Sequence, residues 1–261
     1  LFAVNEKGEV DPDIMDNIPG IEHLSIADLV IVYSRFLDLP DKQMQHFFNF
    51  LDSGTPIIGI RTANHGFKKF YVSENGKQKR YTVDGKNKHF GIHVLGGTFA
   101  GHYGGWHREG TRGVIVKGQE KHPILKGVTD IFGPTDVYST NPQGLYDESK
   151  AILLGQPLVG LKPTDKPNTK KPPIPIAWTK TWTGNTGKTS KDFQVTMGSA
   201  EDFLSEDLRR LVINASYWCL DMEDKIPTKS KADIVGTYQP SKSDVKKHIK
   251  GRTPAFYERL D

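Results

Sequence analysis

Residues 29–60, LVIVYSRFLDLPDKQMQHFFNFLDSGTPIIGI, decide the fold of this chain. They open with a continuous apolar run over 29–33, which is typical of a strand covered on both faces. A helix follows, because the next apolar residues recur at helical spacing: Met44, Phe47, Phe48 and Leu51. A second apolar strand is predicted over 56–60. Strand, helix and strand with short connections form a right-handed βαβ unit with parallel strands.

The rest of the chain continues with short apolar runs and one long amphipathic stretch. Strands are predicted over 113–117, 151–155, 175–178 and 193–197. Residues 201–220 carry an apolar stripe and predict the longest helix. Between these elements, residues 68–95 are rich in Lys, Asn and Gly, and predict a hairpin insertion over a sheet edge.

Residues 222–261 hold few large apolar side chains. We therefore expect one α/β domain over residues 1–221 and an extended C-terminal tail over residues 222–261. Such a tail is a candidate for contacts within a homo-oligomer.

Composition excludes several classes of protein. The chain has 261 residues, 36% hydrophobic and 25% charged, with a net charge of +4. No apolar run approaches the roughly twenty residues of a membrane span. The basic excess lies in 162–191 and after Lys225, without interleaved aromatic residues, so no nucleic-acid partner is expected. Cys219 is the single cysteine, which excludes an internal disulfide and a thiolate zinc cluster.

The chain begins directly in an apolar run, LFAV, without a start methionine. We expect an upstream segment that would carry any targeting signal. The targeting segment itself is not visible, and a periplasmic or secreted location is slightly favoured over a cytoplasmic one.

Four polar residues directly follow the strand at 56–60: Arg61, Thr62, Asn64 and His65. Ligands of open α/β sheets bind beyond the carboxyl ends of the strands. A guanidinium, a hydroxyl, an amide and an imidazole at such an end predict a binding or catalytic site. The alternative interpretation is a polar loop that caps the next element.

A second candidate segment is 95–112, LGGTFAGHYGGWHREGTR, with six glycines. Glycine lets a backbone approach a ligand closely, and the ring of Trp106 could stack on a sugar. His102 and His107 offer proton transfer or metal ligation. The spacing of the histidines matches no compact zinc signature such as HExxH, so we expect neither a metal nor a cofactor. A glycine loop with surface histidines remains the alternative.

Three further strand ends supply polar groups. Asp136 and Tyr138 lie in FGPTDVY, and Lys180 lies in PIAWTKTW. We expect these side chains to reach the same region as the histidines. Ser199, followed by two acidic residues, is predicted to be the N-cap of the long helix.

Several motifs occur in a characteristic order: GTPIIGIRTANHGF, LGGTFAGHYGGWH, HPILKGV, FGPTDVY, PIAWTKTW and TMGSAEDFLSEDLRRLVINASYWCL. Together they resemble the ThuA-like (trehalose-utilisation) family over residues 25–221. The resemblance implies the class I glutamine amidotransferase-like fold, a flavodoxin-like three-layer sandwich with a mostly parallel sheet. It also implies a first strand and helix of that fold, which we expect upstream of residue 1.

The resemblance implies a role in the catabolism of disaccharides, notably trehalose and 3-keto sugars. True amidotransferases of this fold carry a cysteine on the turn after the strand that 56–60 resembles. Arg61 stands at that position here, and Cys219 lies far along the chain. Glutamine hydrolysis through a thiolate is therefore not expected.

The leading hypothesis is an enzyme that acts on a disaccharide or a 3-keto sugar, of isomerase or hydrolase type. His65 and His102 would be the acid and base, and Arg61 the electrophilic anchor. The expected substrate contacts are Thr62, Asn64, Trp106, His107, Asp136, Tyr138 and Lys180. Two alternatives are a non-catalytic sugar-binding or assembly module, and a metal hydrolase ligated by His65, His102 and His107.

Overall fold

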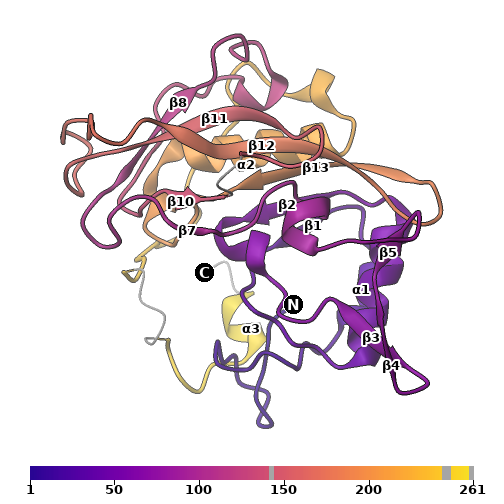
Figure 1. The fold of residues 1–261 in the computed structure, drawn as a ribbon. Helices are drawn as coiled ribbons and strands as arrows, with labels where there is room; N and C mark the ends of the chain where they lie inside the picture. Colours follow the sequence, from indigo (N-terminus) through magenta and orange to yellow (C-terminus); the bar gives the residue numbers. More distant parts are fainter. Residues whose placement is uncertain (141–143, 243–247, 259–261) are drawn as a thin grey trace.

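The protein is built around a curled seven-stranded sheet, seen in Figure 1. The computed structural model describes residues 1–140, 144–242 and 248–258. The strand order is β1-β2-β13-β12-β11-β8-β9. The bounds are Val30–Val32 for β1, Ile57–Ile60 for β2, Thr111–Ile115 for β8, Phe132–Gly133 for β9, Lys150–Pro157 for β11, Ile174–Thr183 for β12 and Thr189–Val195 for β13.

The predicted βαβ unit is confirmed. β1 and β2 pair in parallel, and helix α1 (Asp41–Ser53) connects them. Gly54 ends α1 in the left-handed conformation, with φ of 76°. Glycine adopts this conformation without the steric cost that a Cβ would add.

The prediction of a mostly parallel sheet is wrong for the sheet as a whole. Parallel pairing is confined to one end, where β2 lies between β1 and β13. The pairs from β13 to β9 are antiparallel. Parallel neighbours need a crossover connection, usually a helix, whereas β12 and β13 are joined by a short turn over residues 184–188.

Two apolar cores lie on opposite faces of the sheet, and β2 contributes to both. Ile57 belongs to the core that contains Phe47 and Leu51 of α1, and Ile58 to the core that contains Leu211 of helix α2 (Glu206–Cys219). This follows from the alternation of side chains along a strand. The arrangement is a mixed α/β fold consistent with three layers.

Helix α2 is shorter than the predicted helix over 201–220, and Ser205, not Ser199, is its N-cap. The Ser205 hydroxyl accepts a hydrogen bond from the Leu208 N–H at 3.3 Å. Residues Asp202–Leu204 form a separate 3₁₀ turn, η5. The Asp202 carboxylate accepts the N–H groups of Gly198 and Ser199 at 2.9 and 3.0 Å, and so closes this turn before the helix begins.

Strand β1 is not covered on both faces, contrary to the sequence prediction. It is the outermost strand of the sheet, and Ile31 and Tyr33 are 51% and 58% exposed. Helix α2 packs against β2 and β13, and the outward side chains of β1 stay exposed.

The insertion over 68–95 contains two hairpins, and the hairpin predicted there is confirmed. Its strands are β3 (Tyr71–Glu74), β4 (Lys77–Arg80), β5 (Thr82–Val83) and β6 (Lys86–Asn87), followed by a π-helical turn, η3 (Phe90–Val94). Asp84 and Gly85 both have positive φ at the second hairpin turn, as a type I′ turn requires. Both hairpins lie beside α1 (Figure 1).

The remaining elements are short. They are η1 (Ile21–Ile26), η2 (Arg61–His65), β7 (Gly101–His102), η4 (Pro123–Leu125), β10 (Tyr138–Ser139), η6 (Glu223–Lys225) and α3 (Pro254–Tyr257).

The first part of the C-terminal tail packs along α2. Ile226 and Ala232 are buried, and the Arg209 and Arg210 side chains donate to the carbonyls of Ala232 and Ser230 at 2.6 and 2.9 Å. No helix among the described residues is long and apolar enough to span a membrane. The domain boundary at residue 221 and the homo-oligomer stay predictions.

Gly59 gives a test of packing inside the parallel part of the sheet. A Cβ at this position would lie 1.9 Å from Gln194 Oε1 and 3.0 Å from Leu95 Cδ1. Gln194 is buried, and its amide donates to the Val195 carbonyl at 2.9 Å, so it has little room to move. Gly59→Ala should therefore lower the free energy of unfolding by about 1–3 kcal/mol, as overpacking does. Chemical denaturation measures this change.

The matched control is Gly105→Ala, whose Cβ would approach no atom closer than 3.3 Å, the distance to Glu109 Oε2. This control should change stability by less than about 0.5 kcal/mol. Equal stability of the two variants would contradict the packing described for β2.

Candidate functional site

Arg61 lies on the tight turn that ends β2, where the sequence places it. Its φ is 45°, a left-handed conformation that few non-glycine residues adopt. The residue is only 3% exposed. Its Nη1 donates to Thr135 Oγ1 at 3.1 Å and to the Thr196 carbonyl at 3.2 Å. The guanidinium also lies 4.4 Å from the centre of the Tyr138 ring.

The Asp136 carboxylate connects Arg61 to His102. Asp136 Oδ1 lies 3.5 Å from Arg61 Nη2, and the carboxylate side chain is fully buried. Asp136 Oδ2 accepts a hydrogen bond from His102 Nδ1 at 2.7 Å. His102 and Tyr138 are register partners of the short β7·β10 pair. One buried carboxylate therefore holds a buried cation and a partly exposed imidazole.

His65 and His102 both pack against the rings of Phe99 and Tyr138. These two aromatic residues are 39 positions apart in the sequence. The His65 ring lies 4.8 Å from Phe99 and 6.2 Å from Tyr138. The His102 ring lies 5.3 Å from Phe99 and 5.5 Å from Tyr138. We call these four residues the histidine cluster. The prediction that the two histidines converge agrees with this geometry.

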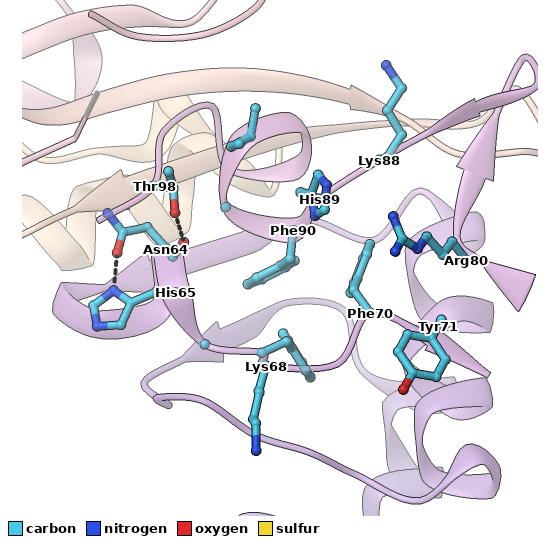
Figure 2. Close-up of a pocket in the computed structure, with 14 residues that line it drawn as sticks. Asn64, His65, Lys68, Phe70, Tyr71, Arg80, Lys88, His89, Phe90 and Thr98 are labelled. Carbon is cyan, nitrogen blue, oxygen red and sulfur yellow. Dashed lines mark hydrogen bonds between the residues drawn. The ribbon is translucent and has the colours of Figure 1, made fainter. Parts of the chain in front are cut away.

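Hydrogen bonding orients both imidazoles in the same way. His65 Nδ1 donates to Asn64 Oδ1 at 2.7 Å (Figure 2), and His102 Nδ1 donates to Asp136. In each ring the Nε2 atom is then the one left to face a ligand. Such a partner on Nδ1 sets the tautomer of a histidine.

His65 is neutral at neutral pH. Burial, and the nearby charges of Arg35, Arg61 and His102, lower its pKa from 6.5 to about 4. With the proton on Nδ1, Nε2 carries a free lone pair and can accept a proton. Burial is also the main cause that raises the pKa of the Tyr138 hydroxyl.

Trp106 and His107 extend the cluster toward solvent. The Trp106 ring stacks beside His102 with centroids 5.8 Å apart and is 48% exposed. His107 has φ of 57°, and its ring lies 4.2 Å from Trp106. An exposed indole next to a histidine fits the stacking role that the sequence suggests.

Lys180 has its polar contacts elsewhere. Its ammonium donates to the Asp147 carbonyl at 3.1 Å and lies 3.8 Å from the Asp147 carboxylate, which also binds His93. Burial is the main cause that lowers the pKa of Lys180. Within the described residues, none of its hydrogen bonds or ion pairs reaches the histidine cluster. Thr62 lies half-buried in η2 beside Arg61.

A pocket of about 310 Å³ adjoins the cluster (Figure 2). Of the predicted site residues, Asn64 and His65 line it, together with residues of the 68–95 insertion. Among the described residues, no group of three or more His, Cys, Asp or Glu side chains could hold a metal ion. Cys219 is buried in α2, and burial raises the pKa of its thiol.

Three residues that the sequence did not single out for the site support it. Phe99 packs between both histidines, and Phe36 covers the other side of His65 at 5.2 Å. Thr135 donates to Asp202 Oδ2 at 2.5 Å while it accepts from Arg61. Thr135 precedes Asp136 in the FGPTDVY motif, so its neighbourhood was visible in the sequence, whereas the pairing with Asp202 was not.

Among known proteins, only solved structures are similar to this chain, and the similarity lies in the fold. No family model matches the sequence, and no curated protein matches it. Two crystal structures similar to this one are described as putative ThuA-like proteins, and so carry the name of the family that the sequence motifs resemble. The protein from Bacteroides uniformis has 17% identity and a TM-score of 0.47, over 80% of this chain and 74% of its own. The protein from Parabacteroides merdae has 13% identity and a TM-score of 0.43, over 76% and 71%.

The buried carboxylate provides a stability test. Asp136→Asn leaves the Arg61 guanidinium buried without a counter-charge. Removing one partner of a buried ion pair costs about 3–5 kcal/mol, and denaturation should show a loss of that order. The control is Asp130→Asn, which breaks an exposed ion pair with Arg112 and should cost less than about 1 kcal/mol. Similar losses in both variants would contradict the role given to Asp136.

The low pKa of His65 predicts a pH dependence. The unfolded chain binds a proton at His65 below about pH 6.5, and the folded protein does so only near pH 4. The stability contributed by neutral His65 is therefore present above pH 6.5 and is lost as the pH falls toward 4. His65→Gln should lose less stability over that range than the unmodified protein. Thermal unfolding at several pH values compares the two, and parallel curves would rule out a depressed pKa.

Proposed function

We propose that this protein is a ThuA-like carbohydrate-utilisation protein that acts on a disaccharide or a 3-keto sugar by histidine acid–base chemistry. One observation carries the proposal: His65 and His102, from separate segments, meet on Phe99 and Tyr138 with both Nδ1 atoms held. The ordered sequence motifs support the family. A flavodoxin-like core around β1, β2 and β13 is part of the same proposal.

An enediol isomerisation suits this pair of groups. His65 Nε2 removes the proton from the carbon beside the ketone, while His102 donates a proton from Nε2 to the carbonyl oxygen. His102 then takes the proton of the neighbouring hydroxyl, and His65 delivers its proton to the former carbonyl carbon, which moves the ketone by one position. Asp136 orients the His102 ring through the hydrogen bond to Nδ1, as the carboxylate of a catalytic triad does.

In a hydrolysis of a disaccharide, His65 and His102 act on water and on the glycosidic oxygen instead. His102 protonates the glycosidic oxygen and His65 activates a water molecule. In both variants Trp106 stacks on the sugar ring, and Asn64 holds the base in its tautomer. We assign Thr62 and His107 to substrate hydroxyl contacts at the edge of the site.

Arg61 acts in this proposal as a positioning residue. Its burial and its bonds to Thr135 and Thr196 leave it little access to substrate, so it acts through Asp136 and Tyr138. Lys180, which binds Asp147, would need to leave that partner to contact a sugar. Cys219 is buried with a raised pKa, which argues against glutamine hydrolysis through a thiolate.

The enclosure of Arg61 also favours a second candidate, a non-catalytic sugar-binding module. Arg61 is buried and bonded to Thr135 and Thr196, so it offers little stabilisation to an oxyanion formed at the cluster. The half-exposed Trp106 would serve such a module equally well.

Substitution of each histidine separates these candidates. His65→Gln and His102→Gln should each reduce turnover of a 3-keto disaccharide by about 100-fold or more, while sugar binding changes little. Proton NMR in deuterated water follows the reaction: isomerisation incorporates deuterium beside the ketone, and hydrolysis releases monosaccharides. The control is His23→Gln, at an exposed histidine in η1. Binding without conversion by the unmodified protein would favour the module, and full activity in either variant would refute the acid–base assignment.

A further inference from the structure

Three permanently charged side chains, Lys68, Arg80 and Lys88, line the pocket beside His65. Five of its residues carry basic side chains, and no Asp or Glu is among them; the basic residues are His65, Lys68, Arg80, Lys88 and His89. In Figure 2, His65 and Asn64 lie at one end of the pocket, and Arg80 and Tyr71 at the other. We call it the basic pocket.

These cations have few local counter-charges. Among the described residues, neither Arg80 nor Lys88 has a carboxylate within ion-pair distance. Lys68 lies 3.7 Å from Asp38 in an exposed pair, which contributes little to stability. The Asp147 carboxylate is close enough to Lys88 for their charges to interact, but it is already bound by His93 and Lys180. The pocket therefore concentrates positive charge, which attracts an anion.

The Asn64 side chain, at one end of the pocket, has a buried and unpaired amide. Asn64 is 1% exposed, and its Nδ2 has no hydrogen-bond partner, whereas its Oδ1 is occupied by His65. Buried donors are nearly always paired in folded proteins, and an unpaired one is costly. In Figure 2 the Nδ2 atom points away from the pocket, so a molecule in the pocket would contact the basic side chains and not this amide.

The walls and size of the pocket suit a small sugar. Phe67, Phe70, Tyr71 and Phe90 form apolar walls, on which the C–H face of a sugar can lie. The volume of about 310 Å³ is at the lower end of the range of small-molecule sites, about 300–1,000 Å³. In Figure 2 the ammonium groups of Lys68 and Lys88 lie at opposite edges of the pocket and point outward from it.

We infer that the basic pocket binds the anionic group of an acidic sugar, a phosphate or a carboxylate, with the sugar carbons directed toward His65. The orientation toward His65 rests on the proposed function, but the binding of the anion does not. Binding of an anion in this pocket narrows the substrate of the proposed function to sugars that carry a negative charge. Arg80 and Lys88 are the residues that select for that charge.

Calorimetric titration of the full chain with three probes tests this inference. Glucose 6-phosphate and glucuronate represent the two sources of negative charge, and glucose is the neutral reference. We expect at least one anionic sugar to bind about tenfold or more tightly than glucose, because each charged hydrogen bond contributes on that scale. Which of the two binds more tightly identifies the anion as phosphate or carboxylate.

Two lysines at the end of the second hairpin, Lys86 in β6 and Lys88 directly after it, give a matched pair of variants. Lys88 lines the pocket, whereas Lys86 in β6 is exposed and lies outside the lining. Lys88→Gln should weaken binding of the anionic sugar about tenfold, and Lys86→Gln should leave it within about twofold, although both remove one positive charge. Arg80→Gln should resemble Lys88→Gln, and it provides a second variant if the first alters folding.

Three results would overturn the inference: no binding of either anionic sugar, binding of glucose with equal affinity, or equal weakening by Lys86→Gln and Lys88→Gln. Failure of the proposed function looks different. Turnover of a neutral 3-keto disaccharide without anion selectivity would refute the pocket alone. Selective anion binding without turnover of any sugar, unchanged in His102→Gln, would refute the catalytic proposal alone.

Discussion

The buried Arg61 guanidinium is the constraint on which the site depends. A cation removed from water is costly unless acceptors surround it. Arg61 finds them on two segments distant in sequence: Thr135 and Asp136 from one, and the Thr196 carbonyl from the other. Satisfying one side chain therefore holds the end of β2, the FGPTDVY motif and the end of β13 together. The pair is better regarded as a device that specifies this arrangement than as a large source of stability.

The histidine cluster is a consequence of this network. Asp136 uses one carboxylate oxygen for Arg61 and the other for His102, so the imidazole takes its position from the buried pair. Tyr138 covers the guanidinium with one face, and His65 and His102 pack against its ring. The cations near His65 also help to keep it unprotonated.

Much of the parallel core could be predicted from the sequence, because its signals are local. The period of apolar residues over 44–51 specifies α1, and the short connections to 29–33 and 56–60 leave little choice but a parallel pair. The direction of the remaining strands could not be predicted in this way. It depends on which strands become neighbours, and the antiparallel order β13-β12-β11-β8 results from contacts between segments. The exposure of Ile31 likewise follows from the edge position of β1, not from its composition.

The sequence by itself determined which polar residues end each strand, because strand length and side-chain type are encoded locally. Arg61, His65 and Asp136 were visible in that way, and His102 was visible in the glycine-rich segment 95–112. Only the tertiary structure decided their partners, which are Asp136 for His102 and Asp147 for Lys180. It also left the Asn64 amide unpaired beside the basic pocket. The physical reason is that hydrogen bonds, desolvation and charge act over a few ångströms in space, and sequence separation carries no record of those distances.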